Sequence, residues 1–172
     1  STDGTGGSIA VNATSEYLGY REGVLNASGV DGGDITVASE NWVSLGGTTK
    51  ADGTQDGGSI NVNANELILS DKVSATGDSG TGGSVTMRST KRSWEIDSSS
   101  VDVSGASGGK ISHVSEGSVF SSGNYTAEGT NGSGGQIDLS GSSVNLLTVT
   151  MDASGTEQGG LVRVGGAFQR LI

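Results

Sequence analysis

The sequence predicts an all-β protein, a right-handed parallel β-helix (solenoid) with about 25 residues per coil, three short strands per coil and about six to seven coils. Two observations predict this fold. A Gly-Gly pair recurs seven times in register along the 172 residues, and apolar residues alternate with polar ones after each pair. The repeat indicates stacked equivalent units, and the alternation indicates strands with one buried side.

The first strand of each unit follows the Gly-Gly pair in the phrase Gly-Gly-x-apolar-x-apolar. Counted on the second glycine, from Gly7 to Gly160, the pairs are 26, 25, 25, 26, 26 and 25 residues apart. We therefore expect the first apolar residues of the seven phrases to form one column inside the coil. These residues are Ile9, Ile35, Ile60, Val85, Ile111, Ile137 and Val162.

Two more alternating segments complete each unit. For the second segment we expect these pairs to point inward: Leu18/Tyr20, Val43/Leu45, Leu67/Leu69, Trp94/Ile96, Val119/Ser121 and Val144/Leu146. For the third segment the expected inward pairs are Leu25/Ala27, Thr49/Ala51, Val73/Ala75, Val101/Val103, Tyr125/Ala127 and Met151/Ala153. Each unit thus carries three short strands, joined by turns of Gly, Ser, Asn and Asp.

Stacking the units explains the unusual composition, which on its own suggests disorder because 32 residues are glycine and only 31% are hydrophobic. Glycine is expected to supply positive φ angles at the corners. Proline is absent, as expected if interior strands donate every ladder N–H. A β-sandwich would not require an in-register repeat. Because no capping sequence is evident at either end, we expect residues 1–172 to be a single β-helix segment, a fragment of a longer repetitive rod.

Composition also excludes several functions. The chain has no cysteine and a single histidine, so we expect no metal site and no cofactor, and the calcium-binding phrase GGxGxDxUx does not occur. The formal net charge of −10 disfavours nucleic acid as a partner. No apolar run approaches the ~18 residues of a membrane span, so we expect no membrane insertion.

The repeat phrase is clearest in ADGTQDGGSINVNA, from Ala51 to Ala64. It resembles the β-helical repeats of large bacterial exoproteins of the filamentous haemagglutinin type, which are secreted by the two-partner route. The resemblance implies a secreted or cell-surface adhesin, associated with the outer membrane, that extends and displays binding regions for attachment or biofilm formation. The partners it implies are an outer-membrane transporter during export and a host or bacterial surface glycan or receptor, or a matrix polysaccharide.

Because β-helices also carry polysaccharide lyases and hydrolases, outward ionisable residues need to be weighed. Lys110, Asp138 and Arg163 are expected to be neighbours on adjacent coils. One carboxylate between two cations favours a surface ion pair over a catalytic acid, so no catalytic residue is assigned. His113 takes an inward position, where we expect a partly buried histidine bonded to a core serine or to backbone.

A carbohydrate-binding strip is the alternative function. In the register given above, Tyr17 and Trp42 point outward at equivalent positions of adjacent coils, and Phe120 points outward on the same sheet. Aromatic rings pack on the apolar faces of sugars, and nearby Asn, Ser and Asp side chains bond the hydroxyls. Three functions therefore remain open: a structural rod, a carbohydrate-binding module and, with less support, a polysaccharide-active enzyme.

Overall fold

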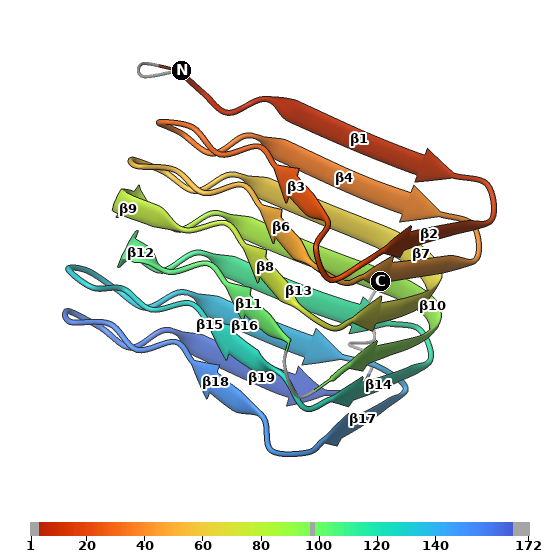
Figure 1. Ribbon diagram of the computed structural model, residues 1–172. Helices are drawn as coiled ribbons and strands as arrows, with labels where there is room; N and C mark the ends of the chain where they lie inside the picture. Colours follow the sequence, from red (N-terminus) through yellow and green to blue (C-terminus); the bar gives the residue numbers. More distant parts are fainter. Residues whose placement is uncertain (1–3, 97–98, 167–172) are drawn as a thin grey trace, which may run out of the picture.

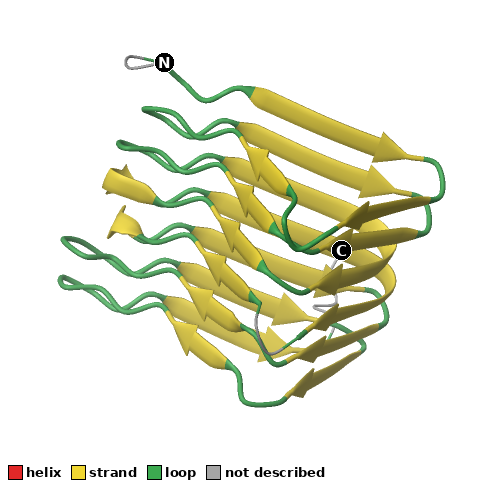
Figure 2. Ribbon diagram, viewed as in Figure 1, coloured by secondary structure: helices red, strands yellow, loops and turns green. Residues whose placement is uncertain are grey.

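The computed structural model describes residues 4–96 and 99–166, and these wind into a parallel β-solenoid of about six turns. The coil is right-handed, and the described residues contain strands and turns but no helix (Figures 1 and 2). The predicted fold class is confirmed. Coils are numbered here by their first strand, so coil 1 begins at Ser8 and coil 5 at Lys110.

The first face of the solenoid is built by the strands that follow the Gly-Gly pairs. They are β1 (Ser8–Ala13), β4 (Asp34–Ser39), β7 (Ser59–Leu69), β10 (Ser84–Glu95), β13 (Lys110–Ser115), β16 (Gln136–Ser140) and β19 (Leu161–Gly165). Each pairs in parallel with the next, in the order β1-β4-β7-β10-β13-β16-β19. Ile9 lies beside Ile35, Ile35 beside Ile60, and so on to Val162, so the predicted inward column is confirmed.

The second face continues the same sheet around a corner. It contains β2 (Glu16–Gly19), β5 (Trp42–Leu45), β14 (Ser118–Ser121) and β17 (Ser143–Leu146), together with the last residues of β7 and β10. Strands β7 and β10 are long because they pass from the first face to the second without a break. The two faces therefore share one hydrogen-bonded sheet.

The third face is a separate six-stranded parallel sheet in the order β18-β15-β11-β8-β6-β3. Its strands are β3 (Val24–Asn26), β6 (Thr48–Lys50), β8 (Lys72–Ser74), β11 (Ser100–Asp102), β15 (Asn124–Thr126) and β18 (Thr150–Asp152). The inward residues of this face agree with the prediction, with Thr49, Val73, Val101 and Tyr125 all buried in one column. Two further strands, β9 (Gly77–Thr81) and β12 (Gly105–Ser107), pair where two neighbouring loops project.

The paired glycines serve a different purpose from the one predicted. Among the glycines of the described residues, positive φ occurs at Gly47 alone, which lies outside the register of the repeat. The repeat glycines are needed for space instead. A Cβ atom added at Gly57 would collide with the Ala75 carbonyl oxygen of the next coil, and one at Gly58 with the Gly33 carbonyl oxygen of the previous coil. Stacking at strand spacing, not backbone handedness, requires these residues to be glycine.

The second face also corrects the predicted phase in two coils. In coil 1, Tyr17 pairs with the buried Val43 and packs against the core, while Leu18 and Tyr20 are exposed. In coil 4, Ser93 and Glu95 are buried and Trp94 points outward beside Ile68. The prediction assumed that the larger apolar residue of each pair lies inside. That assumption fails in coil 4 because His113 and Tyr125 offer polar partners there.

Candidate functional site

The structure places the three aromatic residues of the predicted strip on different rows. The predicted outward orientation of Tyr17 is wrong, because its ring packs inward against the core in line with Val43. Trp42 does lie on the outward side of β5, but it is half-buried and its Nε1 atom is buried without a hydrogen-bond partner. Phe120 points outward as predicted, and the residue is 40% exposed. The predicted three-residue strip does not form.

A different outward row does bring apolar side chains together. Parallel pairing on the second face places Ile68, Trp94 and Phe120 next to one another on coils 3, 4 and 5. We call these three residues the lateral row. It continues at its ends into Ser44 and Asn145. Sequence reasoning missed Trp94 because it assigned that residue inward, although Trp94 and Phe120 are 26 residues apart, which is one coil.

One ring of the lateral row is covered by a cation. The Arg92 guanidinium carbon lies 4.4 Å from the centroid of the Trp94 ring. Glu66, on the neighbouring coil, fixes the guanidinium with contacts of 2.7 Å and 2.8 Å to its Oε2 atom. A cation over an aromatic face at an exposed site is worth about 0.5–1 kcal/mol. This arrangement holds Trp94 in place and leaves Phe120 as the more accessible ring of the row.

The predicted ion pair on the first face is present. The Arg163 guanidinium binds the Asp138 carboxylate through two hydrogen bonds, and Gln136 donates a third. The hydrogen bond from Arg163 is the main reason that the pKa of Asp138 is lowered, and the positive charges of Arg163 and Lys110 act in the same direction. A carboxylate held in its ionised form is suited to an ion pair and unsuited to acid catalysis.

The interior of coils 4 and 5 holds a polar cluster. His113 Nε2 lies 2.6 Å from Ser93 Oγ, and His113 Nδ1 lies 3.3 Å from both Glu95 Oε1 and Tyr125 OH. Tyr125 OH also donates to Glu95 Oε2, which accepts a 2.8 Å bond from Ser121. The predicted bond between His113 and a core serine is confirmed, but the histidine is fully buried and not partly buried as predicted. We call these five residues the buried cluster.

The buried cluster resembles a hydrolytic triad in its order of groups, Ser-His-carboxylate. Its position is wrong for that role, because the exposure of Ser93 and of His113 is 0%. A nucleophile must meet its substrate, and the core around Ser93 gives a substrate no access. Burial of the Tyr125 hydroxyl, reinforced by the nearby Glu95 carboxylate, raises the pKa of Tyr125 well above its ordinary value. The buried cluster therefore belongs to the packed core and does not form a site for a substrate.

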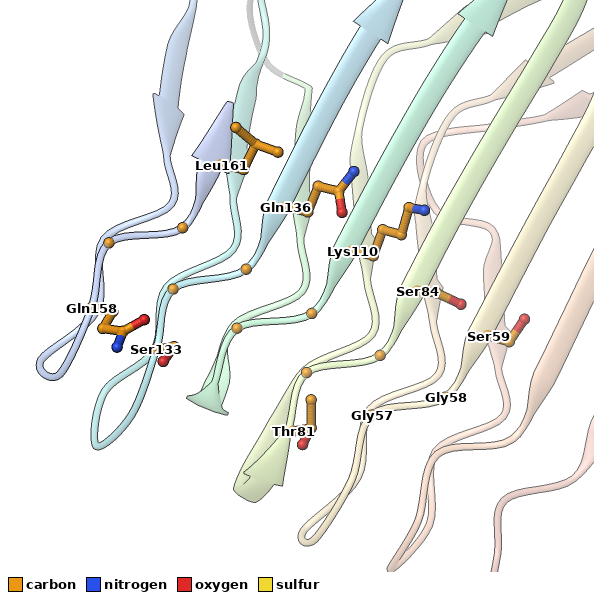
Figure 3. Close-up of a pocket in the computed structure, with 18 of the residues that line it drawn as sticks. Gly57, Gly58, Ser59, Thr81, Ser84, Lys110, Ser133, Gln136, Gln158 and Leu161 are labelled. Carbon is orange, nitrogen blue, oxygen red and sulfur yellow. The ribbon is translucent and has the colours of Figure 1, made fainter. Parts of the chain in front are cut away.

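An open groove of about 950 Å³ runs along the solenoid beside the Gly-Gly corner (Figure 3). Its floor is glycine backbone, including Gly57 and Gly58. Ser84, Lys110 and Gln136 line one side, and Thr81, Ser133 and Gln158 line the other. The ionisable residues along it are Asp34 and Lys110. The groove follows from the glycine stacking described above, and it gathers no pair of acids.

Across residues 4–96 and 99–166, no three His, Cys, Asp or Glu side chains lie close enough together to hold a metal ion. No helix in the same ranges is long and apolar enough to cross a membrane.

Comparison of the chain with protein-family models, with curated proteins and with solved structures gives no match. The function must therefore be argued from the repeat and from the surface of the solenoid.

Proposed function

We propose that this chain is a rod segment of a secreted or cell-surface bacterial adhesin, in which it extends and displays binding regions for attachment or biofilm formation. The observation that carries the proposal is the uniform in-register stacking of the first-face strands from β1 to β19. Each coil of about 25 residues lengthens such a rod by one strand spacing, about 4.8 Å. The resemblance of the phrase at 51–64 to filamentous haemagglutinin repeats supports the same role.

Two features of the chain suit export and display. It has no cysteine, so no disulfide has to form or to pass through an outer-membrane transporter in a folded loop. Its net charge of −10 and its small polar surface residues favour the solubility of a long rod. The partners proposed are the transporter during export and, at the displayed end, a surface glycan, a receptor or a matrix polysaccharide.

Labelling of intact cells tests this role. Antibodies raised against the purified chain are applied to unpermeabilised cells of the bacterium that encodes it, with a cytoplasmic protein as the control for leakage. We expect labelling at the cell surface or recovery in the medium, and loss of that signal when the cognate outer-membrane transporter is deleted. Signal confined to permeabilised cells contradicts the proposal.

A carbohydrate-binding module is the second candidate, and the lateral row favours it. Ile68 and Phe120 flank Trp94 on neighbouring coils, so an extended polymer lying along the solenoid would meet an apolar side chain at each strand spacing. Ser44 and Asn145 at the two ends, with Glu66 beside the row, supply groups that can bond sugar hydroxyls. In this proposal Phe120 replaces Tyr17 and Trp42 as the main stacking residue.

A glycan array distinguishes the two candidates. The wild-type chain is compared with Phe120→Ala and with Tyr20→Ala, which removes a ring that is 76% exposed and lies outside the lateral row. Lateral recognition predicts at least a tenfold loss of binding for Phe120→Ala and wild-type binding for Tyr20→Ala. If both variants retain wild-type binding on every glycan, or if the wild-type chain binds none, the lateral site is excluded and the rod role stands alone.

A further inference from the structure

The buried cluster interrupts a core that is otherwise nearly interchangeable from coil to coil. At the position of His113 the other coils carry Val, Met or Leu, and at the position of Glu95 coils 2 and 3 carry Leu45 and Leu69. Apolar inward residues are non-directional, so one coil stacks on another with similar energy whichever coil it is. In a repetitive solenoid, the apolar columns therefore do not determine which coil stacks on which.

The cluster spans one coil boundary only. Ser93 and Glu95 lie on β10 in coil 4, whereas His113, Ser121 and Tyr125 lie on β13, β14 and β15 in coil 5. Four of its contacts cross the boundary: His113 with Ser93 and with Glu95, Ser121 with Glu95, and Tyr125 with Glu95. Outside the cluster, a further buried hydrogen bond joins Ser89 Oγ to Ser115 Oγ at 2.8 Å across the same boundary.

We propose that the buried cluster fixes the register of the solenoid, so that coil 5 stacks on coil 4 and on no other coil. The physical reason is the cost of a wrong partner. If coil 5 stacked on coil 3, His113 and Tyr125 would face Leu67 and Leu69 instead of Ser93 and Glu95. His113 and Tyr125 would then lose their hydrogen bonds to coil 4 and keep only those they make within coil 5, with each other and with Ser121. Glu95 would lose its partners in the same way.

Substitution by the residues of the other coils tests the energetic part. Removing one partner with His113→Val, or the other with Glu95→Leu, leaves a buried polar group unpaired and lowers Tm by roughly 10 °C. The double variant Glu95→Leu/His113→Val has a more uniform core, and we expect it to recover most of that loss. A double variant whose loss equals the sum of the two single losses overturns the proposal, because the pair is then not coupled.

Disulfide trapping tests the register itself, and the absence of native cysteine makes it clean. Thr86 and Ser112 are direct neighbours on β10 and β13, so a cysteine pair there reports the native register. Asn61 and Ser112 are two strands apart, about 9.6 Å, too far for a disulfide unless coil 5 has stacked on coil 3. Each pair is oxidised during refolding from denaturant.

We expect the 61/112 pair to stay reduced in the wild-type background and to crosslink at least fivefold more in Glu95→Leu/His113→Val. Thr49→Val, which removes a buried hydroxyl in coil 2 outside the cluster, is the matched control and should behave as the wild type does. If 61/112 crosslinking in the double variant equals that of the wild type, the cluster does not set the register. The wild-type and control measurements remain interpretable even if a single variant fails to fold.

Discussion

Asp138 and Arg163 form the best-connected ion pair on the outside of the solenoid. The carboxylate accepts hydrogen bonds from Arg163 and Gln136, and these bonds lower its pKa in the folded state. A lowered folded pKa adds stability above the ordinary pKa of 3.8, and that stability is lost as the pH falls through the folded value. The arginine side chain is 45% exposed, so the contribution is that of a surface pair and is small.

We therefore expect Asp138→Asn to lower Tm by roughly 2 °C at pH 6. Below the ordinary aspartate pKa the difference from the wild type should shrink, because the wild-type carboxylate then becomes protonated as well. Thermal unfolding between pH 2.5 and 7 measures it. A difference that stays constant over this range would show that the ion pair does not contribute through its charge.

Tyr125 gives the opposite pH dependence. Burial and the Glu95 carboxylate raise its folded pKa above the ordinary value of 10.0. Its contribution is therefore complete below pH 10 and is lost as the pH rises from there toward the folded pKa, since the unfolded chain ionises first.

At pH 8, Tyr125→Phe should lower the free energy of unfolding by about 1.5–3 kcal/mol, because the variant loses a hydrogen bond to a buried carboxylate. Above pH 10 the gap between the two proteins should narrow. Urea unfolding at a series of pH values checks this, with Tyr17 and Tyr20 unchanged in both proteins. A gap that widens at high pH would contradict the assigned direction.

Among the structural elements, the Gly-Gly corner is the one where close packing of neighbouring coils most clearly requires glycine. Gly57 and Gly159 are both the first glycine of a pair. A Cβ atom at Gly57 meets backbone atoms of Ala75 and Gly83, whereas a Cβ atom at Gly159 meets nothing within 4 Å. The two positions are matched in sequence context and differ in whether a following coil is stacked against them.

We expect Gly57→Ala to cost roughly 3 kcal/mol or more, since backbone atoms of the next coil must move to make room. Gly159→Ala should be nearly neutral. Chemical denaturation of both variants measures the contrast. Equal effects at the two positions would mean that the pairs are not required for close stacking.

The sequence predicts the inward residues of the first and third faces well and misplaces those of the second face in coils 1 and 4. First-face strands start directly after a Gly-Gly pair, which sets their phase in every coil. The corner before the second face varies in length: the inward Val62 and Leu67 are five positions apart, whereas Val37 and Val43 are six positions apart. Alternation cannot be carried across a corner of variable length. On the second face, the choice of inward residues therefore depends on hydrophobicity alone. This criterion gives the wrong orientation for Tyr17 and Trp94.

The same error in the second-face orientation affects the predicted binding residues. The sequence predicts the outward position of Phe120 correctly. It does not predict the lateral row, because it assigns Trp94 to the core. His113 and Ser93 are 20 residues apart and lie in different coils. The sequence therefore predicts that His113 bonds a core serine but does not identify that serine as Ser93. Pairing each second-face residue with the residue one coil away, 24 to 26 positions on, aligns Trp94 with Phe120.

For the whole molecule, the account depends on successive coils lying directly above one another along a single axis. Parallel pairing runs through all seven first-face strands, and the inward columns of coils 2 to 5 are buried throughout. The first outward row contains Ser8, Ser84, Lys110 and Gln136 in this order along the axis.

Distances between spin labels along this row test the stacking most directly, using cysteines introduced in pairs at Ser8 with Ser84, Lys110 or Gln136. The account predicts backbone separations of about 14, 19 and 24 Å, rising by one strand spacing of about 4.8 Å at each step from Ser84 to Gln136. Separations that do not increase steadily, or that are broadly distributed for the nearest pair, would contradict the stacked solenoid.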